Sequence, residues 1–358
     1  MRLNTITWLT LLSLAGIAHA DEQRRYTILV DNGVKAGEQI VDINAKGETK
    51  VRFIFKDNGR GPELNETITL NADGTIASYV GQGKSTFGSI IKESYQRQGN
   101  QASWTAGESK GSAKVDGSAL YLPVDGSAEI SSISINAIAR SGKDHIALLP
   151  SGQLTQKRVG DLIVEKAGEK QQVQLLVQTG VGLEPYFVWA TTGENPRLFA
   201  SISPGSSTMI EEGWQEHADK MASIQQAAEI KLLEQLATAV PVELPGLSVI
   251  RNARIFDSVS AKVGEAKDIY FLRGKITAIV PVGSLTTVAE NQIDAKGRIV
   301  VPGLFDMHGH ISRWEGPLHF AAGVTSLRDM GNDNISLQQM IDEISSDRLL
   351  APTISPTG

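Results

Sequence analysis

The feature that most constrains the fold is the apolar run Ile299–Phe305, which ends in the pattern Asp306-Met-His308-Gly-His310. A run of this kind predicts a buried β-strand. Successive side chains of a strand point to opposite faces, so Asp306, His308 and His310 are expected on one face. Two imidazoles one residue apart on a rigid strand can hold a divalent cation. The sequence therefore predicts a metal-binding strand end.

The segments that follow this strand predict a parallel α/β arrangement. A helix is expected over 317–322, a buried strand over 323–330, a helix over 336–345 and a further strand over 351–355. Strand, helix, strand, helix is how a parallel sheet begins, and ligands gather at the carboxyl ends of its strands. The two histidines are therefore expected where such a fold places its active site.

A His-x-His pair alone is weak support for a metal site. A chain with 6 His contains such a pair by chance in about one case in ten. The position of the pair, after an apolar strand and Pro302-Gly303, adds weight. The chain has no Cys, so any metal must be held by His and carboxylates.

Residues 1–20 predict a cleaved signal peptide. Arg2 precedes the apolar run Ile6–Ile17, and Ala18-His-Ala20 supplies the small-residue cleavage pattern. The run is shorter than the roughly 20 residues that span a bilayer. No later segment is long and apolar enough to do so, so no transmembrane segment is expected. We therefore expect an exported protein, periplasmic or secreted, cleaved near Ala20.

Residues 21–205 predict an antiparallel β-rich domain. Short alternating or β-branched runs, such as Tyr26–Val30 and Lys50–Phe55, are separated by turn signals such as Asp57-Asn-Gly59. A short helix is expected over 132–139. We found no cluster of His, Asp or Glu in this domain that indicates catalysis.

A linking helix is expected within 206–245, because apolar residues recur at steps of three or four from Ile210 to Ala239. Ser206, Ser207 or Thr208 is expected to cap its start, and Pro241 to follow its end. Residues 246–302 then predict a second β-rich unit, with a turn at Arg273-Gly274.

The charge balance excludes one class of partner. The net charge is -6 and 41% of the residues are hydrophobic, an ordinary balance for a soluble globular protein. An acidic chain has no general attraction for nucleic acid, so no nucleic-acid partner is expected. No feature of the sequence specifies an oligomeric state.

Residues 247–358 resemble the opening of a metal-dependent hydrolase of the amidohydrolase superfamily. The likeness is carried by Val249–Asp257, by Asp294–His310 and by Ala322–Gly331. It implies a partial β-sandwich over 246–302 and the start of a (β/α)8 TIM-like barrel over 303–358. It also implies one or two divalent ions, commonly zinc, which activate water to attack an amide, ester or ring C–N bond. The residues before Ile210 resemble, more loosely, the β-rich leader of some exported members.

The resemblance assigns roles to particular residues. His308 and His310 match the first-strand metal ligands of the family. Asp306 is expected either to orient a ligand His or to make a packing or strand-end hydrogen bond. Asp329 ends the next strand, where it either lines the same mouth or, as we favour, caps the following turn. His319 is expected to be a surface or packing residue.

The remaining ligands of the family come from later strands, and a complete barrel takes about 250 residues. We therefore expect an incomplete barrel, a fragment of a longer enzyme that is inactive alone, with no catalytic residue of its own. The function expected of the whole protein is hydrolysis of a small-molecule amide, peptide-like or cyclic amide substrate. The alternative is a β-domain binding or interaction module attached to a degenerate, non-catalytic barrel.

Overall fold

A computed structural model describes residues 22–30 and 33–357. The predicted signal peptide, residues 1–20, lies outside the described residues. The chain divides into two compact units, Met1–Ala228 and Glu229–Gly358, and the boundary falls within helix α2 (Ala218–Ala239). None of the helices formed by the described residues is both long and apolar enough to cross a membrane.

The first unit is a long β-sheet with one face packed on a helix, α1 (Glu129–Ser141). The strands run in the order β8-β7-β6-β5-β4-β3-β2-β1-β15-β14-β13-β12-β11-β10-β9. Their bounds are β1 Glu22–Val30, β2 Val34–Ile43, β3 Thr49–Phe55, β4 Glu63–Leu70, β5 Ile76–Lys84, β6 Ile90–Gln98, β7 Gln101–Ala106, β8 Ser109–Lys114, β9 Ala119–Tyr121, β10 His145–Leu149, β11 Gln153–Lys166, β12 Glu169–Thr179, β13 Tyr186–Thr191, β14 Leu198–Ser203 and β15 Ser207–Glu211.

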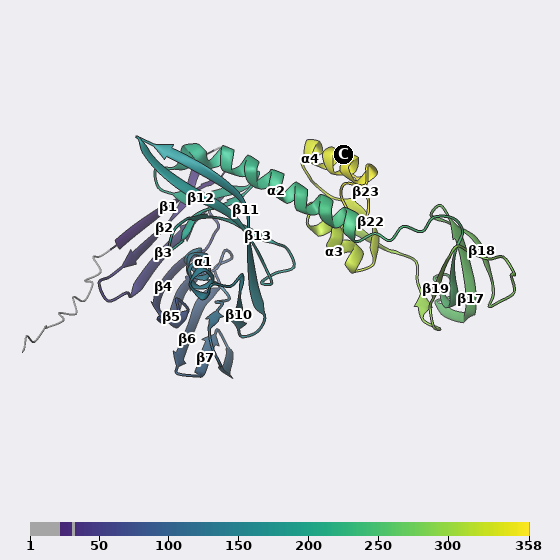
Figure 1. The fold of residues 1–358 in the computed structure, drawn as a ribbon, viewed down its shortest axis with the longest axis horizontal. Helices are drawn as coiled ribbons and strands as arrows, with labels where there is room; N and C mark the ends of the chain where they lie inside the picture. Colours follow the sequence, from purple (N-terminus) through teal and green to yellow (C-terminus); the bar gives the residue numbers. More distant parts are fainter. Residues whose placement is uncertain (1–21, 31–32, 358) are drawn as a thin grey trace, which may run out of the picture. The chain divides into compact units, whose positions relative to one another are not determined.

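Helix α1 supplies the centre of the hydrophobic core of this unit. Ile130, Ile133 and Ile138 pack with sheet residues from both halves of the sheet, among them Ile68 and Val188. Figure 1 shows α1 between the strands β1–β7 and the strands β10–β13. Full burial of an isoleucine stabilises a fold by about 1.5–3 kcal/mol. The helix therefore holds the two halves of the sheet together.

The predicted β-rich character of residues 21–205 is confirmed, with one departure from an antiparallel pattern. Strands β9 and β10 pair in parallel, with Leu120 opposite Leu148. A parallel pair cannot be joined by a hairpin and needs a crossover, usually a helix. Helix α1 is that crossover, and it includes the predicted helix 132–139.

The helix predicted from Ile210 begins later than we expected. Ser207–Glu211 forms strand β15, a 3-10 turn covers Gln215–His217, and α2 begins only at Ala218. Ile210 fits a helical period with Trp214, but it is buried where β15 pairs with β1 and β14. The ladder hydrogen bonds and this burial outweigh the local pattern, so the predicted cap at Ser206–Thr208 is wrong.

The second unit contains a mixed sheet and a parallel one. Strands β16 (Ser248–Asp257), β17 (Lys262–Leu272), β18 (Lys275–Pro281) and β19 (Asn291–Asp294) lie in the order β18-β17-β16-β19, and β20 (Ile299–Val300) also pairs with β16. Strands β21 (Leu304–Gly309), β22 (Val324–Asp329) and β23 (Thr353–Pro356) form a parallel sheet in that order. Helices α3 (Glu315–Ala321) and α4 (Asn334–Ser345) connect its strands.

The run Ile299–His310 is not the single buried strand that we predicted. Val301, Pro302 and Gly303 separate β20 from β21. Proline has no N–H to donate, so it interrupts a ladder. The side chains of Leu304 and Phe305 are 54% and 69% exposed. Among the described residues, β21 is an edge strand with β22 as its sheet neighbour, so apolar composition alone did not secure burial.

Candidate metal centre

The candidate site lies at the carboxyl end of β21, where a bulge changes the direction of the strand. Asp306 is opposite Leu327 of β22, whereas Gly309 is opposite Asp329, so β21 has one extra residue in this stretch. Such a bulge re-aims the side chains around it. A Cβ atom at Gly309 would lie 2.7 Å from the side chain of Leu327, so a larger residue here would displace that side chain.

The structure brings the two predicted ligands, His308 and His310, together. Their ring centroids are 5.5 Å apart and the planes are inclined by 66°. Both side chains are exposed. Neighbouring, accessible imidazoles on one strand end can bind the same ion without a large rearrangement.

His310 is held in one tautomer by its surroundings. Its Nδ1 lies 3.1 Å from the carbonyl oxygen of Gly331. A carbonyl only accepts, so Nδ1 must donate, and in the neutral ring Nε2 keeps its lone pair. Metal-binding histidines are commonly oriented in this way by a backbone carbonyl or a carboxylate. The sequence alone did not reveal this contact, because Gly331 lies 21 residues away.

Asp329 is buried, with 1% of its surface exposed, and it ties together the loops that follow β21 and β22. Its Oδ2 accepts the N–H of Ile311 at 3.0 Å, and its Oδ1 accepts the N–H of Gly331 at 3.1 Å. The side chain of Asn332 also donates to Oδ2, at 3.3 Å. Asp329 thus positions both the backbone that follows His310 and the glycine whose carbonyl contacts the ring of His310.

Asp306 is engaged by neighbours other than the two imidazole rings. Its Oδ1 accepts the N–H of His308 at 3.0 Å, and its Oδ2 lies 3.5 Å from Nε2 of His319 on α3. The Nδ1 of His319 donates to the carbonyl of Glu315 at 2.8 Å, so the contact with Asp306 is an ion pair only when that ring is protonated. A role for Asp306 in orienting a metal ligand stays a prediction. The contact with His319 was not foreseen.

The residues fit part of a metal site. The His308–His310 pair offers two imidazoles, one of them with its tautomer set. Within residues 22–30 and 33–357, however, no group of three or more His, Cys, Asp or Glu side chains is placed to hold an ion together. An open catalytic zinc site needs about three protein ligands.

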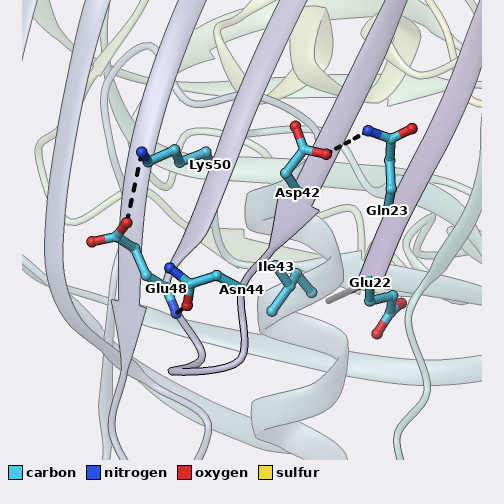
Figure 2. Close-up of a pocket in the computed structure, with 7 residues that line it drawn as sticks. All are labelled: Glu22, Gln23, Asp42, Ile43, Asn44, Glu48 and Lys50. Atoms are coloured by element: carbon cyan, nitrogen blue, oxygen red, sulfur yellow. Dashed lines mark hydrogen bonds and ion pairs between the residues drawn. The ribbon is translucent and has the colours of Figure 1, made fainter. Parts of the chain in front are cut away.

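Several carboxylates also line a hollow of about 360 Å³ at one end of β1–β3, away from the histidine pair. Figure 2 shows Asp42 hydrogen-bonded to Gln23 at 2.6 Å and Glu48 paired with Lys50 at 3.9 Å. These carboxylates already have partners in neighbouring side chains, and none of the described lining residues is a histidine. We do not consider this hollow a metal site.

The site thus consists of a parallel β-α-β unit with an imidazole pair at the end of its first strand. No protein-family model matches the chain. Adenine deaminase 3 from Rhizobium johnstonii is 35% identical over 63 residues, which cover 18% of this chain and 10% of the relative. An adenine deaminase from Ruegeria sp. is 37% identical over 92 residues, 25% of this chain and 15% of the relative.

A third relative carries a different name. A dihydroorotase from Pelotomaculum thermopropionicum is 36% identical over 63 residues, 18% of this chain and 14% of the relative. These relatives confirm the predicted resemblance to the amidohydrolase superfamily. The chain matches 10%, 10% and 14% of the lengths of the first three curated relatives.

Solved structures with detectable similarity include a Xaa-Pro dipeptidase with bound methionine in the active site. It is 22% identical, the alignment covers 31% of this chain and 33% of that one, and the TM-score is 0.27. Molinate hydrolase is 18% identical over 33% of this chain and 31% of that one, also with a TM-score of 0.27. Scores this low carry no argument about the present fold.

Proposed function

We propose that this chain supplies the first ligand strand of an exported, metal-dependent hydrolase that acts on carbon–nitrogen bonds. The observation that carries the proposal is the His308–His310 pair at the carboxyl end of β21, with the tautomer of His310 set by Gly331. The proposed ion is divalent, zinc being the first choice, because imidazole nitrogen is a preferred zinc ligand and the chain has no Cys.

The proposed substrate is a small molecule with an amide, peptide-like or cyclic amide bond. Relatives named adenine deaminase and dihydroorotase support the hydrolysis of a C–N bond at the level of the superfamily, and deamination is one such reaction. A bound divalent ion would supply activated water and a polarised scissile group. In this chain, His308 and His310 would bind the ion, while Asp329 and Gly331 would keep His310 oriented toward it.

We further propose that residues 1–358 alone do not hydrolyse such a substrate. The described residues provide the two imidazoles but no third ligand beside them. Leu304, Phe305 and Met307, at 54%, 69% and 60% exposure, leave β21 with apolar surface that further barrel strands would cover. The proposal therefore requires additional ligands from other polypeptide.

Export is proposed from the sequence pattern that ends at Ala20. N-terminal sequencing of the protein recovered from the periplasm or the medium should begin at Asp21. Recovery of the protein only inside the cell, with Met1 or Arg2 as its first residue, would contradict the proposed export without affecting the proposed chemistry.

The test of the site is metal analysis of the protein expressed from its natural reading frame. The double substitution His308→Ala with His310→Ala should lower bound zinc by at least one ion per chain and abolish hydrolysis of small amides. His145→Ala is the matched control, because His145 lies in the first unit beside Asp144. If the double variant kept both its metal and its hydrolysis, the site assignment would be wrong.

A further inference from the structure

The first unit contains a hollow of about 340 Å³ that has no part in the candidate metal centre. Small-molecule sites in proteins usually have volumes of about 300–1,000 Å³. The hollow lies between the start of α1 and the sheet. Its lining residues are Ile28, Phe53, Phe55, Gly126, Ser127, Ala128, Ser131, Tyr186, Ser201, Ser203, Ser207 and Met209.

The floor of the hollow follows one row of residues across five neighbouring strands. The register places Phe55, Gly37, Ile28, Met209 and Ser201 side by side, from β3 through β2, β1 and β15 to β14. Directly opposed residues in antiparallel strands share a face, so the row forms a continuous surface. Because Gly37 has no side chain, the row is lowest between Phe55 and Ile28.

The position of Gly37 cannot take a larger residue. A Cβ atom there would collide with the carbonyl oxygen of Ile54, so the depression is a property of the backbone rather than of one rotamer. The rings of Phe53 and Phe55 are each half-buried and line the hollow beside it. The floor is therefore a concave, partly aromatic surface on which the apolar part of a ligand can pack.

Hydroxyl groups surround this apolar floor. Ser131 comes from the first turn of α1, and Ser203 and Ser207 come from the β14–β15 hairpin. Tyr186 closes one side, with its hydroxyl 2.7 Å from Oγ of Ser201. These groups can donate or accept a hydrogen bond and suit carbonyl or hydroxyl groups of a ligand.

A fully buried amide lies next to the floor. Gln39, with 0% exposure, is opposite Phe53 in the register of β2 and β3. Among the described residues, neither its Oε1 nor its Nε2 has a hydrogen-bond partner. Buried side-chain polar atoms without a partner are uncommon in folded proteins. Gln39 itself does not line the hollow, so the amide makes the interior behind Phe53 polar without offering a ligand a direct contact.

Charge determines the kind of ligand. None of the lining residues that the structure describes is charged. Two buried carboxylates lie near the start of α1, and both have partners in the protein. Glu129 pairs with Arg24 at 3.1 Å, and Glu66 accepts the N–H of Ser127 at 2.9 Å. A charged ligand would lose hydration in the hollow without gaining a partner.

We infer that this hollow binds an uncharged amphipathic small molecule, with an apolar body on the floor and carbonyl or hydroxyl groups toward the serines. The inference does not depend on the metal site, because every residue that carries it belongs to the first unit.

The test compares two fluorescent probes on the full chain. N-phenyl-1-naphthylamine is uncharged, and 8-anilinonaphthalene-1-sulfonate adds a sulfonate to the same ring system. We expect saturable binding of the uncharged probe, with the sulfonate at least about tenfold weaker because its charge has no partner. Ser207→Phe should fill the hollow and weaken the uncharged probe about tenfold or more.

Ser206→Phe is the matched control, because Ser206 lies in the adjoining turn, is exposed and does not line the hollow. It should leave the affinity unchanged. If circular dichroism shows that Ser207→Phe does not fold, Ser203→Phe replaces it with the same expected loss. Equal affinities for both probes, or equal effects of the Ser206 and Ser207 variants, would overturn the inference and place the probe on other apolar surface.

Discussion

His310 and Gly331 are joined by a hydrogen bond of 3.1 Å from the ring Nδ1 to the main-chain carbonyl. The N–H of the same glycine donates to Asp329, also at 3.1 Å. The orientation of an imidazole at the end of β21 is therefore set by the residues that end β22. In a parallel sheet, neighbouring strands end at the same edge, which makes this dependence possible.

The first prediction concerns Asp329. Asp329→Ala leaves the N–H groups of Ile311 and Gly331 without their acceptor, and a buried donor without a partner costs about 1–3 kcal/mol. We expect faster hydrogen exchange at both amides and weaker metal binding by His310. Asp329→Asn keeps one acceptor oxygen and should have a smaller effect. Asp342→Ala, an exposed carboxylate of the same unit, should change neither amide.

The second prediction concerns the turn between β17 and β18. Arg273 and Gly274 have φ values of 50° and 72°, and Leu272 pairs with Lys275, so the loop is a two-residue hairpin with both residues left-handed. A non-glycine residue in this region costs about 1–2 kcal/mol, and Asn tolerates it best. Arg273→Asn should therefore raise the free energy of unfolding, and Gly274→Ala should lower it by about 1 kcal/mol.

Urea unfolding monitored by hydrogen exchange in β17 and β18 measures both changes. Arg273→Ala is the control, because it removes the same charge without the tolerance of Asn for a positive φ. Equal stability of the Asn and Ala variants would show that charge, and not backbone conformation, controls this turn.

The turn at Arg273-Gly274 and the candidate metal centre differ in how much of each the sequence could predict. Arg273-Gly274 is a local signal, and the turn lies where it was expected. The closeness of His308 and His310 was also predicted, because two residues separated by one position lie near each other without help from distant parts of the chain. The bond from His310 to Gly331 depends on a helix and a strand that lie between them, so no local pattern contains it. The exposure of Phe305 was missed for a related reason, because burial depends on neighbours and not on composition.

The start of α2 illustrates the opposite kind of failure. Ile210 fits a helical period as well as a strand. Which structure forms depends on β1, whose Tyr26–Val30 backbone pairs with β15 across about 180 residues of sequence. Tertiary pairing of this kind overrides a local preference.

The third prediction is acid sensitivity at Asp268, which is fully buried. Burial alone would raise the pKa of this carboxyl, but the N–H groups of Gly283 and Asn252 and the guanidinium of Arg251 together lower it. A lowered folded-state pKa gives stability that is present above the unfolded value of about 3.9 and is lost as the pH falls through the folded value.

Asp268→Asn should therefore reduce the unfolding free energy near pH 7 by about 1–3 kcal/mol and reduce its loss on acidification. Urea unfolding of the second unit at about pH 7 and at about pH 2, below the unfolded value, reports both effects. Glu265→Gln is the control, since Glu265 is exposed on the same strand as Asp268. An unchanged pH dependence in Asp268→Asn would refute the assignment.

The fourth prediction concerns Glu66, whose pKa is shifted in the direction opposite to that of Asp268. Burial raises the pKa of this carboxyl, and the hydrogen bonds from Ser127 and Tyr79 offset that effect only in part. A raised folded-state pKa favours the protonated form in the folded protein. Its stabilising contribution is complete below the unfolded value of about 4.3 and declines as the pH rises through the folded value.

Glu66→Gln keeps the shape of the side chain and removes the buried charge. Its oxygen can still accept from Tyr79 and the N–H of Ser127, and its NH₂ group can donate to the hydroxyl of Ser127. We expect the Gln variant to match or exceed the stability of the parent near pH 8, with the difference shrinking toward about pH 4. Glu66→Ala should instead destabilise by about 1–3 kcal/mol for each donor that loses its acceptor.

Urea unfolding of the first unit at both pH values distinguishes these outcomes, with Glu108→Gln as the exposed control. A parent that gains stability over Glu66→Gln as the pH rises would mean that the carboxylate is better stabilised by Ser127 and Tyr79 than burial allows. Ser127, near the start of α1, lines the hollow and donates its N–H to Glu66. The same experiment therefore measures how much this contact contributes to the stability of the side of the hollow formed by Ser127.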